Sequence, residues 1–177
     1  MSQATDERVT EPLRAEHRHL LPHVEALAEA GDSVGVEAAA DLLARVDGVH
    51  EFLTAHLIPH ATAEDVVLYP EVDGLIGRRG ETRPTDTMRR DHDEVVRLTE
   101  RLGLVRDRVR QLGPSQADER ELRRVLYGLY ALVSLHFAKE EEVYLPLLDR
   151  ELTAAEAQTL FERMEHAGHA AGAAHGH

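Results

Sequence analysis

The chain has 177 residues, a length that predicts one domain, and its 33 acidic against 20 basic residues give a formal net charge of −13. This charge, together with only three Phe, four Tyr and no Trp, argues against nucleic-acid partners and against anionic membrane surfaces. The absence of cysteine excludes disulfides, thiolate metal sites and cysteine nucleophiles, and it leaves 12 histidines as the unusual feature of the composition.

Apolar residues recur at helical spacing in four long stretches of the chain, and no stretch shows the alternation typical of a strand. The sequence therefore predicts an all-α fold. Gly, Pro and polar residues separate the stretches, and a Thr-x-x-Glu capping pattern begins a fifth, shorter one. In chain order the predicted helices are 10–31, 34–68, 85–113, 115–149 and 153–165.

Short connections between long amphipathic helices favour antiparallel neighbours, so we expect an up-down-up-down four-helix bundle over residues 10–150. A short C-terminal helix is expected within residues 151–166. Residues 1–9 are predicted to be flexible, and the Ala, Gly and His of residues 167–177 are typical of a disordered tail that binds metal only weakly.

The sequence offers no sign of a membrane segment or a leader. No run of 18 apolar residues occurs, and the N-terminal sequence MSQATDERVTE lacks the apolar core of a signal peptide. We therefore expect a cytoplasmic protein.

The two halves of the predicted bundle, residues 10–70 and 85–146, repeat one pattern at an offset of 75 or 76 positions. Each half has an acidic residue followed by His, then a His-x-x-x-Glu 43 or 44 positions later, and then Val-Leu-Tyr-Pro or Val-Tyr-Leu-Pro. The acidic-His steps are Glu16-His17 and Asp91-His92. The two halves therefore look like a duplicated helical hairpin.

Six residues of this repeat are predicted to enter one core. On helical wheels the four histidines lie within apolar stripes, which include Leu21, Val96 and Val143, and each glutamate follows its histidine by one turn on the same face. The six residues are His17, His60, Glu64, His92, His136 and Glu140.

Buried imidazoles and carboxylates each cost several kcal/mol unless they are paired or bind a metal. Imidazole and carboxylate donors without sulfur suit iron, manganese or zinc. The twofold repeat favours two ions, with both carboxylates bridging them and open positions left for water, oxygen or peroxide. The alternative is a metal-free core of hydrogen-bonded histidines.

This arrangement, with its Val-Leu-Tyr-Pro and Glu-Glu-Val-Tyr-Leu-Pro helix ends, resembles the hemerythrin-like family, also called the HHE cation-binding domain, and in particular its actinobacterial members. The resemblance covers about residues 10–150. It implies a four-helix bundle that holds two Fe ions in a non-haem, oxo- or hydroxo-bridged centre. Such a protein binds or reacts with O2, H2O2 or NO, in sensing or in handling oxidative or nitrosative stress.

The sequence departs from the oxygen carriers of that family, which use seven ligands and a His-x-x-x-His on the third helix. Here Val96 stands four positions after His92. This departure favours sensing or redox turnover over stable oxygen carriage. An iron-binding or buffering module, a reversible oxygen carrier and an enzyme acting on peroxide or NO all remain open, as does the oligomeric state.

Two further histidines are candidates for the same site. His56 lies one turn before His60, and we expect either an extra ligand, a supporting or gating side chain, or a structural histidine bonded to a backbone carbonyl that Pro59 leaves free. His23 is expected at the edge of the first stripe, as a boundary residue or an extra ligand. Tyr69 and Tyr144 are interpreted as packing residues, with a redox-relay role as the alternative, and Glu141 and Glu142 as a solvated surface.

Overall fold

The computed structural model describes residues 8–77 and 83–175, which form helices and connecting turns without a strand. The predicted all-α fold is therefore confirmed. In chain order the elements are α1 (Glu11–Ser33), α2 (Ala39–Phe52), η1 (Leu53–Leu57), α3 (Ile58–Ala63), η2 (Glu64–Leu68), α4 (Tyr69–Ile76), α5 (Asp86–Leu112), α6 (Gln116–Lys139), η4 (Glu140–Tyr144), α7 (Leu145–Glu151) and α8 (Ala154–His175), where η marks a π-helical turn. None of the described helices is long and apolar enough to cross a membrane.

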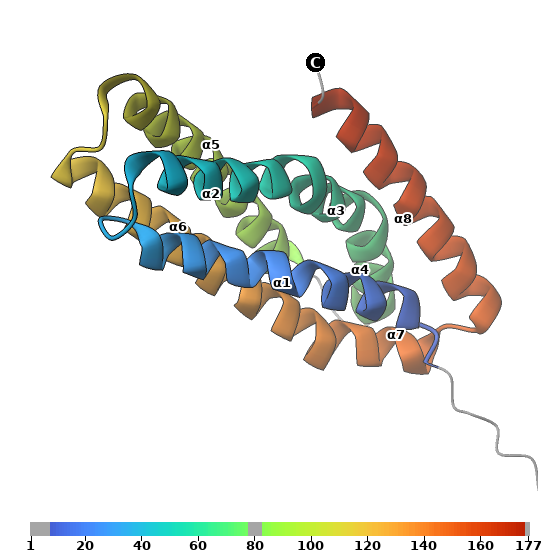
Figure 1. Ribbon diagram of the computed structural model, residues 1–177. Helices are drawn as coiled ribbons and strands as arrows, with labels where there is room; N and C mark the ends of the chain where they lie inside the picture. Colours follow the sequence, from blue (N-terminus) through green and yellow to red (C-terminus); the bar gives the residue numbers. More distant parts are fainter. Residues whose placement is uncertain (1–7, 78–82, 176–177) are drawn as a thin grey trace, which may run out of the picture.

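Four helical stretches pack around one core (Figure 1). They are α1, the unbroken stretch 39–76, α5, and the unbroken stretch 116–151. Helix α1 packs against α2 and α6, and α5 packs against the same two helices, so each stretch has two neighbours. Helix α8 lies outside this bundle, where it packs on α3 and on the π turns η1 and η2.

The ends of the helices follow local sequence signals. The backbone N–H and the hydroxyl of Thr10 both donate hydrogen bonds to Asp149 Oδ1, at 3.0 and 2.9 Å, which ties the start of α1 to the end of α7. Gly113 ends α5 with a φ of 78°, a conformation that favours glycine. Ser115 and Asp118 form a capping box at the start of α6.

Two of the helical stretches contain π turns, and two of these turns begin at a glutamate of the His-x-x-x-Glu repeat, Glu64 in η2 and Glu140 in η4. A π turn widens the helix and changes the angle between successive side chains, and such turns are frequent at functional sites. Val143, expected in the core on an ideal α-helical wheel, is for this reason 58% exposed. Leu21 and Val96 were also expected to face inward, but both lie at the edge of their stripes and are partly exposed.

Three predicted helix limits are wrong. The second stretch begins at Ala39 and not at residue 34. The second stretch continues past Leu68 to Ile76, because Pro70 falls in the first turn of α4, where a missing N–H is tolerated, and because Tyr69 and Val72 are buried.

Helix α8 continues to His175, so that the described part of the predicted tail is helical. Its small residues permit close packing: a Cβ built at Gly168 would lie 3.9 Å from the Cβ of Ala63. Residues 1–7, 78–82 and 176–177, which were predicted to lie in the N-terminal arm, the loop and the tail, are outside the described residues.

Buried apolar side chains form two clusters along the bundle. The larger cluster includes Leu20, Val95 and Val133, and the smaller cluster includes Leu13 and Met88. On α1, Leu13 of the smaller cluster precedes His17 by one turn, and Leu20 of the larger cluster follows it. The order is the same on α5, and it is reversed on the stretches 39–76 and 116–151, where the larger cluster lies toward the start of the stretch and the smaller cluster toward its end. The predicted ligands therefore form a polar layer between two apolar clusters.

Candidate metal centre

All six candidate ligands lie together in this polar layer, and none is more than 7% exposed. Helix α1 supplies His17, the stretch 39–76 supplies His60 and Glu64, α5 supplies His92, and the stretch 116–151 supplies His136 and Glu140. Four elements far apart in the sequence thus place one or two polar side chains each in the centre of the bundle.

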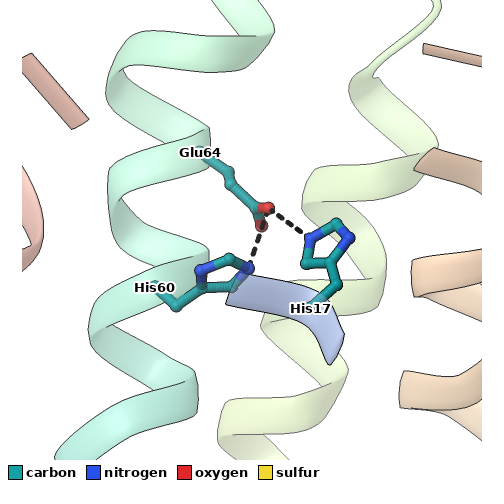
Figure 2. Close-up of side chains that lie close together, drawn as sticks. All are labelled: His17, His60 and Glu64. Carbon is teal, nitrogen blue, oxygen red and sulfur yellow. Dashed lines mark ion pairs between the residues drawn. The ribbon is translucent and has the colours of Figure 1, made fainter. Parts of the chain in front are cut away.

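The carboxylate of Glu64 lies between two pairs of histidines. Its Oε1 is 3.0 Å from His60 Nε2 and 3.7 Å from His17 Nε2, and Figure 2 shows both imidazoles turned toward this carboxylate. Its Oε2 is 3.3 Å from His92 Nε2 and 4.0 Å from His136 Nε2. Each oxygen therefore faces a different pair of imidazoles.

The carboxylate of Glu140 spans the same two pairs. Its Oε2 is 3.4 Å from His17 Nε2, and its Oε1 is 3.6 Å from His136 Nε2. The two glutamates thus have equivalent positions with respect to the histidine pairs, as the sequence repeat predicts.

Several buried polar atoms in this layer have no hydrogen-bond partner. They are His17 Nε2, His60 Nε2, both carboxylate oxygens of Glu64 and Glu140 Oε2. Buried polar atoms without partners are costly and call for an explanation, for which a bound ion is one. Two sets of three donors, His17, His60 and Glu64, and Glu64, His92 and His136, each have ligand atoms within 4.8 Å of one another. The residues present therefore fit two cations that share Glu64.

Each of the four histidines has a supporting carboxylate, which accepts a hydrogen bond from Nδ1, the ring nitrogen that faces away from the centre. In the first pair, His17 Nδ1 donates to Glu141 Oε1 and His60 Nδ1 donates to Glu16 Oε1, both at 2.9 Å. In the second pair, His92 Nδ1 donates to Asp65 Oδ1 at 2.9 Å and His136 Nδ1 donates to Asp91 Oδ2 at 3.1 Å. Because an ionised carboxylate can only accept, Nδ1 carries a hydrogen, and Nε2 is the ring nitrogen that faces the centre. This is the arrangement that orients imidazoles as metal ligands.

These four carboxylates were not predicted as site residues, although the repeat contains a signal for them. Each one is the direct neighbour of a candidate ligand in the sequence: Glu16 and Asp91 precede a histidine, and Asp65 and Glu141 follow a glutamate. The interpretation of Glu141 as a solvated surface residue is wrong. It lies in π turn η4 with its side chain directed at α1, where it binds both His17 and Arg14.

Tyr69 also lies at the site, although the sequence interpretation favoured a packing role for it. Its side chain is fully buried, and its hydroxyl donates to Glu140 Oε1 at 2.7 Å and lies 3.1 Å from His136 Nε2. Its ring stacks on His92 with centroids 5.5 Å apart. Burial and the nearby charges of Glu64 and Glu140 raise the pKa of Tyr69, so the phenol keeps its proton. Tyr144 lies outside the cluster and donates to Pro84 O.

Burial and mutual charge set the protonation of the layer. Burial alone would lower the pKa of His136, but the hydrogen bond with Asp91 and the charges of the two glutamates raise it to about 9. Burial would raise the pKa of Glu64, but the imidazoles, His60 first, hold it well below its usual range. Burial and the charge of Glu64 raise the pKa of Glu140. A metal-free centre therefore holds protons that a cation would displace.

The two additional candidates, His56 and His23, do not reach the centre. Both side chains are exposed. His56 lies in π turn η1, and His23 packs flat on Phe52 at a centroid distance of 5.0 Å. Neither side chain lies in the polar layer, and neither belongs to the two sets of donors described above.

Comparison with known proteins places the whole bundle in one family. A family model described as the hemerythrin HHE cation-binding domain matches residues 8–148, which contain all six candidate ligands and their supporting carboxylates. No curated protein and no solved structure matched the chain. Because the family model covers most of its length, the chain belongs to the hemerythrin HHE cation-binding domain family.

Proposed function

We propose that this protein holds two iron ions in the polar layer and uses them to bind or react with O2, peroxide or NO, in sensing or in oxidative or nitrosative stress. The observation that carries this proposal is the position of Glu64, whose two oxygens face two different pairs of imidazoles and have no hydrogen-bond partner of their own. One carboxylate shared by two sets of donors is the geometry that a two-metal site needs.

In this proposal His17 and His60 would hold one ion, His92 and His136 would hold the other, and the two ions would share Glu64 and Glu140. Family membership and the sulfur-free donor set support iron. Bound iron would supply electrons and coordination positions for a small oxidant. Six protein ligands shared by two ions leave such positions, because each octahedral ion accepts six.

The chain's own residues define the environment of those positions. The apolar clusters on both sides of the layer keep bulk water away, so hydrogen bonds and charges inside it act strongly. The Tyr69 hydroxyl keeps its proton within the layer and donates it in a hydrogen bond to Glu140. The up-down-up-down order of the four stretches is part of the proposal and is supported by the packing of each stretch on two neighbours.

Anaerobic reconstitution of the full chain with Fe²⁺, followed by removal of loosely held metal with a weak chelator, tests the proposal. We expect two irons per chain, and we expect exposure to O2, peroxide or NO to change the optical spectrum. His136→Ala should lower the iron content, whereas His23→Ala, an exposed histidine outside the layer, should not. Fewer than two irons in the unmodified chain would contradict the two-ion centre.

The same preparation separates the competing functions. Steady consumption of peroxide or NO supports an enzyme, and a single spectral change without turnover supports a sensor. Oxygen bands that vanish when O2 is removed would indicate a reversible carrier. Two bound irons that respond to none of the three ligands would leave iron buffering as the function.

A further inference from the structure

A cavity of about 1110 Å³ lies between α1, the stretch that contains η1 and α3, and helix α8. Three histidines outside the metal centre line it: His19 from α1, His56 from η1 and His169 from α8. These three come from elements that are distant in the sequence, and all three side chains are exposed. Helix α8, which forms one wall of the cavity, lies beyond the part of the chain matched by the family model.

The inner end of this cavity reaches the metal centre. His60 and Glu16 both line the cavity, and they are joined by the 2.9 Å hydrogen bond from His60 Nδ1 to Glu16 Oε1. On its other side the same imidazole presents Nε2 to Glu64 at 3.0 Å. The His60 side chain therefore lines the cavity and also contacts the shared carboxylate.

The charge of the cavity favours a cation. Among the described residues that line it, four are glutamates, Glu11, Glu16, Glu162 and Glu165, and Arg8 is the one arginine or lysine. Acidic clefts with low-dielectric walls concentrate cations and speed their arrival. Imidazole and carboxylate side chains are also the donors that a divalent transition-metal ion binds.

We propose that this cavity is the route by which a divalent metal ion reaches the metal centre, with His19, His56 and His169 as transient ligands along it. The inference rests on the proposed two-iron centre and adds to it the path of loading. Within the described residues, the sets of three or more donors close enough to hold an ion are those of the centre itself. The cavity histidines are spread apart, which suits passage of an ion rather than its storage.

Metal-uptake kinetics test this route without reference to activity. Metal-free full-length protein is mixed anaerobically with Fe²⁺, and the reaction is quenched at intervals with a chromogenic chelator that reports the iron not yet bound. The test variant is His19→Ala/His56→Ala/His169→Ala. The matched control, His23→Ala/His50→Ala/His166→Ala, removes three histidines that do not line the cavity.

We expect the test variant to take up iron several-fold more slowly than the control and to reach the same final content of two irons. Equal uptake rates in the two variants would overturn the inference while leaving the two-iron centre intact. A lower final content in the test variant would also overturn it, because the histidines would then contribute to holding the ions. Failure of the unmodified chain to bind two irons would refute the proposed function and the route together.

A second pair of variants tests the charge of the route. The two variants have the same net charge and differ only in where two carboxylates are neutralised. Glu162→Gln/Glu165→Gln neutralises two cavity carboxylates on α8, and Glu100→Gln/Glu151→Gln neutralises two exposed carboxylates elsewhere. We expect the cavity pair to slow uptake roughly tenfold at low ionic strength, with the difference shrinking as salt is added. Equal slowing by both pairs would mean that overall charge, and not the cavity, attracts the ion.

Discussion

The two halves of the metal centre have the same donors but different surroundings. In both halves two imidazoles face the shared glutamates, and a carboxylate supports each imidazole from behind. The His17–His60 half is covered by Phe137, whose ring stacks on His17 with centroids 4.4 Å apart. The other half is covered by Tyr69, which adds a hydroxyl within hydrogen-bonding distance of Glu140.

This difference follows from small departures within the sequence repeat. The Leu-Tyr of one half is Tyr-Leu in the other, so that Leu145 occupies the position that corresponds to Tyr69. Ala61 likewise occupies the position that corresponds to Phe137. The duplicated hairpin thus sets a symmetric set of donors, and the residues between them make the two sets inequivalent. Two ions bound here would differ in polarity and in the hydrogen bonds near them.

Glu64→Gln should have the largest effect, because the Glu64 carboxylate makes the shortest contacts with the histidines of both halves, at 3.0 and 3.3 Å. The amide keeps the volume of the side chain but loses its charge and one acceptor oxygen. We expect iron affinity to fall more than about 100-fold, above the range for loss of a supporting residue, and iron content to fall to one ion or none. Metal analysis after anaerobic reconstitution measures this.

Variants of a single half provide the comparison for Glu64→Gln. His17→Ala and His92→Ala each remove a donor from one half only, so each should leave one ion in place. If Glu64→Gln retains two irons, the glutamate does not join the halves, and the comparison between them loses its structural basis.

The pH dependence of the metal-free protein should show the protons that the layer holds. The pKa of His136 is raised from its ordinary value of 6.5 to about 9. A group whose folded pKa is raised stabilises the fold below its unfolded pKa and loses that contribution as the pH rises through the folded pKa. We therefore expect the metal-free protein to lose about 3 kcal/mol of stability from His136 between about pH 6.5 and pH 9.

Urea unfolding of the metal-free and iron-loaded protein at several pH values measures this effect. The loaded protein should not show the loss, because metal-bound imidazoles are neutral at every pH in this range. An NMR titration of His136 and His17 would show whether the two halves release their protons at different pH values. A metal-free protein whose stability is flat from pH 6.5 to 9 would contradict the prediction.

The supporting carboxylates should affect the two halves equally. Asp65 supports His92 and Glu141 supports His17 from corresponding positions of the repeat, and their side chains are similarly exposed, at 32% and 31%. We expect Asp65→Asn and Glu141→Gln each to weaken iron binding by about 10- to 100-fold. Competition with a chelator measures the affinities, and Glu142→Gln, an exposed neighbour, is the control. Effects that differ strongly between the two variants would show that the supports are not equivalent.

The sequence predicted the six donors of the polar layer and missed the carboxylates that support the histidines and the hydroxyl of Tyr69. His17 and His92 could be placed in the core because their positions repeat and because helical periodicity assigns them to an apolar face. The contact between Glu141 and His17 joins α1 to η4, and no local pattern specifies how closely two helices pack. The sequence pattern likewise gives no signal for the π turns, which direct the side chains of His56 and Val143 toward solvent. What failed was the assumption of a constant angle per residue along each helix.

Tyr69→Phe should have the smallest of these effects and is the most direct test of the difference between the halves. It removes the hydroxyl that donates to Glu140 and leaves a buried carboxylate oxygen without that partner. We expect the metal-free protein to lose about 2 kcal/mol of stability, because hydrogen bonds to charged buried groups exceed ordinary ones. Tyr144→Phe is the matched control, since its hydroxyl donates to the neutral Pro84 carbonyl and its loss should cost about 1 kcal/mol.

With iron bound, Tyr69→Phe should alter the spectrum and Tyr144→Phe should not. Equal losses of stability and unchanged spectra would mean that the hydroxyl does not distinguish the two halves, and that Tyr69 acts as an apolar cover in the same way as Phe137.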